Sequence, residues 1–174
     1  MKLRDNKGFT LIELLIVVAI IGIIAAIAVP GLLRARMSGN EASAIGSLRS
    51  INSAQASYAS GAAQGGYAIL LATLGTACAA GTEGFISPDL ANDPSTKSGY
   101  TVVLASNGGG AGPLDCNGVA TETSYYASAV PVTLNSTGVR AFATNQAGTI
   151  WQDATGAAAP AEPFAAGGAV SPIQ

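Results

Sequence analysis

The sequence predicts an α+β protein in which one long N-terminal α-helix packs on a small antiparallel β-sheet. Between residues 9 and 58, apolar residues first run almost without interruption and then recur every three to four residues, the spacing of one helix face. From residue 100 onward, short segments alternate apolar and polar residues and are separated by Asn and Gly, which is typical of antiparallel strands. We therefore expect one face of the sheet to cover the apolar stripe of the helix.

The first predicted element is a membrane-spanning helix behind a basic leader. Residues 1–8 contain Lys2, Arg4 and Lys7, and in residues 9–29 only Glu13 is charged. A helix of this length spans about 31 Å, which matches the hydrocarbon core of a bilayer. Because basic flanks stay in the cytoplasm, everything after Pro30 is expected on the other side of the membrane.

Glu13 lies inside this apolar segment and needs a partner. An acid costs roughly 2.5 to 3.5 kcal/mol at the centre of a membrane helix, and less near its end. If the chain were cut after Gly8, Phe9 would become the N-terminus and carry a positive amine one helical turn from Glu13. That amine points along the axis of its own helix, so a neighbouring chain shifted along the axis would present its amine to Glu13 better.

This junction resembles that of a known family. The residues Lys7-Gly8-Phe9-Thr10-Leu11-Ile12-Glu13-Leu14 are similar to the class III signal peptide of type IV pilins and type II secretion pseudopilins. The resemblance implies that a membrane-embedded aspartyl prepilin peptidase cuts between Gly8 and Phe9 and N-methylates Phe9, and that Glu13 is needed for subunit docking. Gly22 and Pro30 stand where the family usually has a glycine and a proline, between which the helix can melt in filaments. The detailed resemblance covers residues 1 to about 36.

The resemblance implies a structural subunit, most simply the major pilin, of a type IV pilus. Before assembly, such a subunit is stored in the inner membrane with its head outside the cytoplasm. It then polymerises with copies of itself into an extracellular helical filament, with the help of the inner-membrane assembly machinery and minor pilins. Adhesion, motility and DNA uptake are all compatible with the sequence. The nearest rival is a type II secretion pseudopilin, although major pseudopilins usually carry an acidic calcium loop where this sequence has a tail rich in Pro, Ala and Gly.

A periplasmic binding module, either anchored by this helix or released from it, is the alternative from another class. Ala26-Ile27-Ala28 resembles a secretory cleavage site behind a basic n-region. However, the apolar run is long for a signal peptide, Glu13 interrupts it, and Pro30 is a poor neighbour for that cut. An uncleaved anchor would leave Glu13 unexplained, and we find no pocket chemistry that a binding module would need.

Residues 30–59 are expected to continue the helix in amphipathic form. The predicted apolar stripe consists of Leu32, Leu33, Met37, Ile45, Leu48, Ile51 and Tyr58. The opposite, polar face holds Arg34, Arg36, Asn40, Glu41, Ser47 and Arg49. Pro30 lacks a backbone donor and clashes with the carbonyl of Ala26, so the helix should kink or loosen there.

The globular head is predicted to cover residues 60–174. It divides into a variable loop at 60–99, a β-meander at 100–153 and an irregular surface tail at 154–174. The expected strands are 100–105, 124–133, 139–144 and 149–152. Pro131 should confine the second strand to an edge or interrupt it.

Composition narrows the possible functions of the head. The whole chain has 8 bases and 10 acids, and the acidic surplus lies almost wholly past residue 60, which disfavours nucleic acid as a partner. Without histidine the chain lacks the usual general base and most zinc sites, so we predict no enzyme, cofactor or metal. The residues Asp89, Asn92, Asp93 and Asp115 could gather around calcium, but their spacing matches no loop signature and favours solvated turns.

The two cysteines, Cys78 and Cys116, are too far apart in sequence for a CxxC redox motif. In an exported domain they most simply form one disulfide, and two buried free thiols are the alternative.

Overall fold

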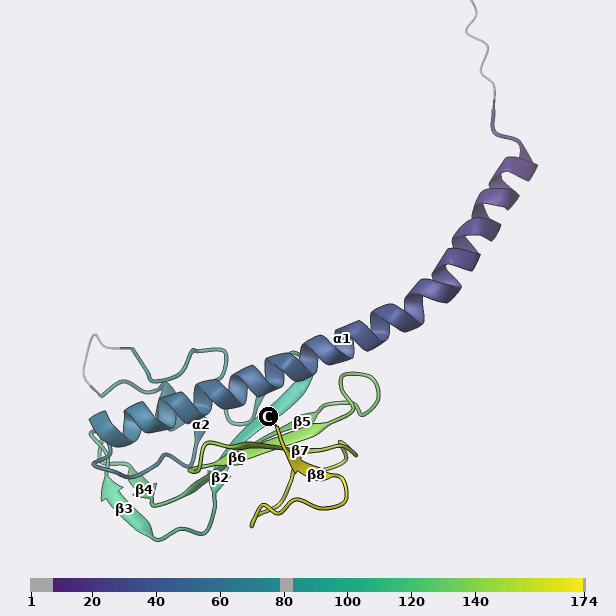
Figure 1. Cartoon of the computed structure of the whole chain (residues 1–174). Coiled ribbons are helices and arrows are strands. Elements are labelled where there is room, and N and C mark those ends of the chain that lie inside the picture. The colour runs from purple at the N-terminus through teal and green to yellow at the C-terminus, as the bar shows by residue number, and fades with distance from the viewer. Residues whose placement is uncertain (1–7, 79–82, 174) are drawn as a thin grey trace, which may run out of the picture. The chain divides into compact units, whose positions relative to one another are not determined.

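The computed structural model describes residues 8–78 and 83–173, so most of the predicted leader, residues 1–7, lies outside the described residues. The chain divides into two compact units, Met1–Arg36 and Met37–Gln174. Helix α1, Leu11–Gly61, contributes to both units (Figure 1).

In the first unit, α1 is exposed on all sides. From Leu11 to Leu33, its large apolar side chains are between about half and about four fifths exposed. A helix that is apolar all round needs lipid or other helices around it. Pro30 does not end the helix, because α1 runs through it from Leu11 to Gly61. The proline lacks the N–H that would bond to the carbonyl four residues earlier in the helix.

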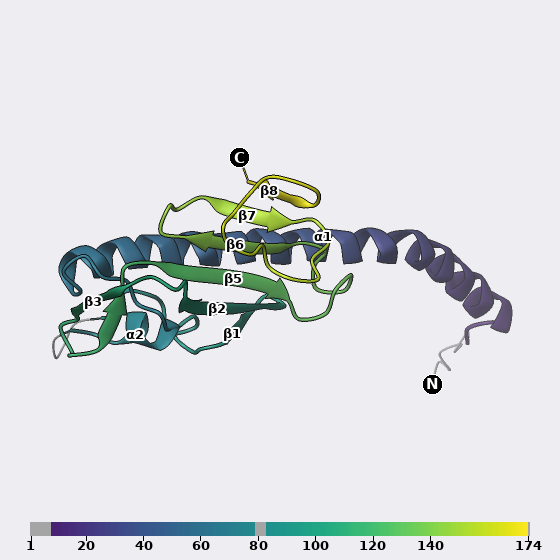
Figure 2. The ribbon, with the colours of Figure 1, turned by 90° about the horizontal axis from the view of Figure 1, so that it is seen from below.

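The second unit contains a six-stranded antiparallel sheet (Figures 1 and 2). Its strands, in spatial order, are β1 (Ser95–Lys97), β2 (Tyr100–Ser106), β5 (Tyr125–Pro131), β6 (Ala141–Asn145), β7 (Ile150–Asp153) and β8 (Val170–Pro172). Strands β3 (Ala111–Leu114) and β4 (Ala120–Glu122) form a separate hairpin in the stretch of sequence that connects β2 to β5. The short helix α2 spans Leu71–Gly75. The predicted α+β class is confirmed.

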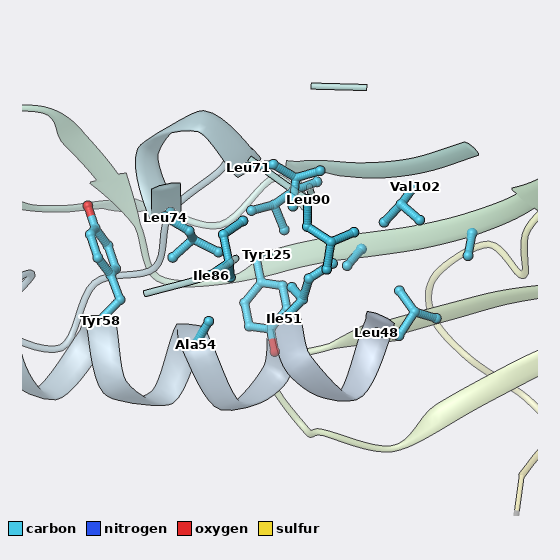
Figure 3. Close-up of a cluster of buried hydrophobic side chains, with 14 of the residues drawn as sticks. Leu48, Ile51, Ala54, Tyr58, Leu71, Leu74, Ile86, Leu90, Val102 and Tyr125 are labelled. Carbon is cyan, nitrogen blue, oxygen red and sulfur yellow. The ribbon is translucent and has the colours of Figure 1, made fainter. Parts of the chain in front are cut away.

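The core lies between the head portion of α1, the segment around α2 and the sheet. Figure 3 shows Leu48, Ile51, Ala54 and Tyr58 of α1 facing Leu71, Leu74, Ile86, Leu90, Val102 and Tyr125. These helix residues are less than 5% exposed and recur every three to four positions. Leu48, Ile51 and Tyr58 belong to the predicted stripe, and Ala54 is an addition to it. Gln55 is buried among them and is satisfied by Ala68, whose N–H and carbonyl both pair with its amide at 3.0 and 2.6 Å.

Two predictions about the sheet need correction. The edge placement for the Pro131 strand is wrong, because β5 lies between β2 and β6. Pro131 is the last residue of β5, and the next residue, Val132, donates its N–H to the carbonyl of Gly99 at 2.9 Å. The missing donor therefore falls where the strand stops, which is the interruption that the sequence also allowed.

The tail was expected to be irregular, and the structure instead places β8 in it. Strand β8 pairs with β7, with Trp151 opposite Pro172. Phe164 stacks on Trp151 at 5.5 Å between ring centroids, and the Tyr126 hydroxyl donates to the carbonyl of Pro160 at 2.6 Å. Partial burial of these rings holds the tail to β5 and β7, an effect that its Ala, Pro and Gly content does not reveal.

Glu41 and Ser47 were predicted on the polar face of the helix, and the structure buries both. The Glu41 carboxylate accepts four hydrogen bonds from the start of the β6 segment. Oε1 accepts the backbone N–H groups of Val139 and Arg140 at 3.0 and 3.2 Å, and Oε2 accepts Nε and Nη2 of Arg140 at 2.9 and 2.6 Å. These bonds compensate the burial of the charge and tie α1 to the sheet.

Cys78 and Cys116 form a disulfide with their Cα atoms 5.5 Å apart, so the predicted pairing is present. Beside it, Asp115 Oδ2 accepts the hydroxyl of Tyr58 at 2.8 Å, while Oδ1 accepts the backbone N–H groups of Asn117 and Val119. Burial, with the hydrogen bond to Asp115, raises the pKa of the Tyr58 hydroxyl. The disulfide joins the β3–β4 hairpin to the segment that follows α2, and the Tyr58 hydrogen bond joins it to the C-terminal part of α1.

The carboxylates Asp89 and Asp93 have partners other than a metal ion. Asp89 pairs with Lys97 and the Ser87 hydroxyl, and the hydrogen bond from Lys97 is the main cause of its lowered pKa. Asp93 accepts the backbone N–H of Leu71 at 2.9 Å, at the start of α2. Across residues 8–78 and 83–173, no group of three acidic, cysteine or histidine side chains is arranged to hold a metal ion.

Candidate functional site at the start of the long helix

Glu13 and Thr10 are joined by three reciprocal hydrogen bonds at the start of α1. The Thr10 backbone N–H and hydroxyl both donate to Oε2 of Glu13, at 2.8 and 2.6 Å, and the Glu13 backbone N–H donates to the Thr10 hydroxyl oxygen at 3.3 Å. This is a capping box, in which an N-cap Thr and a Glu three residues later satisfy each other's free donors. The acid in the apolar helix therefore has a local partner within its own chain.

Our sequence reasoning missed this role of Thr10, although the pattern Thr-x-x-Glu before an apolar run is the usual signal for a capping box. The signal lies in the unsatisfied N–H groups of the first turn, which Thr10 and Glu13 pair, and not in the charge of Glu13. Glu13 also lies where the positive end of the helix dipole favours an acid.

Gly8 and Phe9, the residues of the predicted cut, precede the helix and are exposed, with Phe9 at 93%. A peptide bond in this position is accessible to a protease without unwinding a helical turn. Gly22 and Pro30 are not brought near Glu13; they lie about 13 and about 25 Å further along the helix axis.

Between Leu11 and Val29 the exposed surface of α1 consists of apolar side chains apart from Glu13 and small residues. Of the described helices, α1 is the one long and apolar enough to cross a membrane. Fold and site together define a class of protein: an α+β head on a long helix, whose N-terminal half is apolar with an acid in its first turn, behind an exposed Gly-Phe junction.

Comparison with known proteins agrees with this class. Residues 3–29 match the model of the prokaryotic N-terminal methylation motif. The type IV major pilin protein PilA of Myxococcus xanthus is 49% identical over 53 residues, which are 30% of this chain and 24% of that protein. The type IV wide pilus major component PilA4 of Thermus thermophilus is 62% identical over 39 residues, 22% of this chain and 30% of that protein.

A fimbrial protein of Pseudomonas aeruginosa is 75% identical over 28 residues, which are 16% of this chain and 18% of that protein. The chain thus spans less than a third of the length of the curated relatives that it matches. No solved structure matches it significantly. The N-terminal segment of this chain is thus similar to that of type IV pilins and carries the prokaryotic N-terminal methylation motif.

Proposed function

We propose that this chain is a major structural subunit of a type IV pilus. The observation that carries the proposal is a single acid, Glu13, in the first turn of an exposed apolar helix that follows an accessible Gly8-Phe9 bond. Such a helix is stable in a membrane, and equally stable when many copies bundle it away from water. A head-to-tail interface that does not close on itself then generates a helical filament.

Maturation would proceed in the inner membrane, with the leader in the cytoplasm and the head outside it. A prepilin peptidase would cut between Gly8 and Phe9 and methylate the new Phe9 amine. The partners of the mature subunit would be the inner-membrane assembly machinery, minor pilins and, above all, further copies of itself in the extracellular filament. No catalysis is part of this role.

Assembly would change the partner of Glu13. In the unassembled chain its Oε2 atom is satisfied by Thr10. In the filament, the positive amine of Phe9 on a neighbouring copy would approach the same carboxylate and neutralise it. A wrong axial register would leave a buried charge without an opposite charge, so this contact would select one register.

Between Gly22 and Pro30 we propose that α1 loosens within the filament. Both residues weaken a helix, since glycine costs about 1 kcal/mol relative to alanine and proline lacks a donor. In the isolated subunit this stretch is helical. Hydrogen exchange on filaments should show fast exchange from residue 23 to residue 29, and continuous protection there would contradict the proposal.

The proposal is tested first by the mass and N-terminal sequence of the protein from its native cell. We expect N-methylated Phe9 and surface filaments that shear off the cells. Glu13→Ala should still be cut and methylated but should yield few filaments, whereas the control Glu83→Ala, which removes an exposed acid of the head, should assemble normally. A normal filament yield from Glu13→Ala would refute the docking role, and methylated Phe9 without surface filaments would favour the pseudopilin alternative.

A further inference from the structure

The head exposes large apolar side chains at two separate places. The proximal patch is Val132, Leu134 and Val139, in the loop between β5 and β6, at 55%, 40% and 38% exposure. The distal patch is Leu114 and Val119 on the β3–β4 hairpin, at 60% and 43%. Among the described residues of the head, Leu70 is the remaining exposed large apolar side chain, and it belongs to neither patch.

The two patches lie at opposite ends of the head. The proximal loop is fixed to α1 at residues 40 and 41: Asn40 donates to the carbonyl of Thr137 at 2.8 Å, and Glu41 accepts the N–H of Val139. The distal hairpin is fixed to α1 at Tyr58 through Asp115. Helical rise between residues 40 and 58 separates these anchors by about 27 Å. Figure 2 likewise shows β3 and the end of β5 at opposite ends of the sheet.

Charge distinguishes the two ends. Both bases that follow residue 60 lie at the proximal end: Lys97, at the turn from β1 into β2, pairs with Asp89, and Arg140 pairs with Glu41, so these charges balance there. The distal end carries the acids Asp115 and Glu122, the latter accepting the hydroxyl of Ser106 at the far end of β2. Two distal ends placed face to face would oppose like charges, whereas a distal end against a proximal end would not.

We propose that the distal patch of one copy packs against the proximal patch of a second copy, so that heads make a head-to-tail contact. The inference rests on the proposed filament and goes beyond it, because that filament requires only the apolar helices to bundle. Two different, complementary surfaces form a heterologous contact that repeats without closing. In a polymer of parallel helices all heads point the same way, so the distal end of one head can meet the proximal end of another. Packing the two patches against each other removes their apolar side chains from water.

The test is a charge-pair rescue in cells that carry the full chain. The variants are Leu134→Asp, Leu114→Lys and the two together, with Leu70→Asp as the matched exposed control. The readout is the fraction of subunit that still sediments as filament after sheared filaments are warmed, with methylated Phe9 verified in each preparation. Each single patch variant should lose about fivefold or more of this fraction, the double variant should recover to within about twofold of wild type, and Leu70→Asp should match wild type.

Other outcomes separate the two levels of the argument. If the double variant is as weak as or weaker than the single variants, the patches do not meet and the contact is refuted. If all variants match wild type, the contact between the patches is likewise refuted, but the proposed filament is not. If Leu134→Asp leaves filaments intact and instead weakens membrane retention of the unassembled subunit, the proximal patch binds lipid and the contact is refuted. Methylated wild-type subunit that forms no filament refutes the proposed function together with this contact.

Discussion

Replacing Glu41 by alanine removes the acceptor that joins α1 to the start of β6. The side chain is 5% exposed and receives four hydrogen bonds, two from backbone N–H groups and two from Arg140. Removing one partner of a fully buried ion pair costs about 3 to 5 kcal/mol. Because the Arg140 side chain is 38% exposed, water can solvate part of its charge in the variant, so we expect the lower end, about 3 kcal/mol.

Urea unfolding of the full chain in detergent, followed through the fluorescence of Trp151, measures this loss. At a slope of about 2 kcal/mol per molar urea, 3 kcal/mol lowers the midpoint by about 1.5 M. Glu41→Gln keeps an acceptor for the two backbone N–H groups and should lose only about half as much. Arg49→Ala, an exposed site on the same helix, should stay within about 0.5 kcal/mol of wild type. A Glu41→Ala midpoint equal to that of Arg49→Ala would refute the structural role assigned to the pair.

Three further changes test other parts of the structure. Cys78→Ser removes the disulfide, which joins two cysteines separated by 38 positions, and should lower the free energy of unfolding by about 4 kcal/mol on the chain-entropy model. A reducing agent should lower the urea midpoint of wild type by the same amount and leave that of the variant unchanged. Thr10→Val removes the hydroxyl of the capping box and should speed amide exchange in the first turn of α1 about fivefold, about 1 kcal/mol, with no effect on exchange in the sheet. Burial, and secondarily Glu162, raises the pKa of Tyr126 to about 12. The hydroxyl of the unfolded chain has a pKa near 10, so above that pH the unfolded state binds fewer protons than the folded state. The contribution of Tyr126 to stability is therefore fully present below pH 10 and is lost as the pH rises towards 12. In Tyr126→Phe the urea midpoint should fall less steeply over this range than in wild type.

Local signals account for the parts of the fold that the sequence predicted correctly. The apolar run, the three-to-four spacing from Leu48 to Tyr58 and the period-two segments each reflect a constraint within a few neighbouring residues. The cysteine pairing was also accessible, because an exported chain with two cysteines has one way to join them.

The errors concern contacts between residues far apart in sequence. Glu41 looked like a solvated helix residue because its partner, Arg140, is 99 positions away. Strand β8 was missed because its stability depends on β7 and on the stacking of Phe164 against Trp151 rather than on its own three residues. At the candidate site, the junction residues alone locate the acid in the first turn of the helix, and the cut between Gly8 and Phe9 stays a prediction. The Thr10 cap depends on the unsatisfied backbone N–H groups of that turn, which a pattern of charges does not reveal.

The two outer strands of the sheet, β1 and β8, are the edges through which copies of this chain could pair strand to strand. An open strand edge is a template for pairing with another sheet, and the danger grows when identical domains are held side by side at high local density. Here β8 ends in the exposed Pro172, which has no N–H to donate, and β1 ends in the charged Lys97. Both edges are short and blunted, so crowding of the heads in the proposed filament would not favour amyloid-like growth through the sheets.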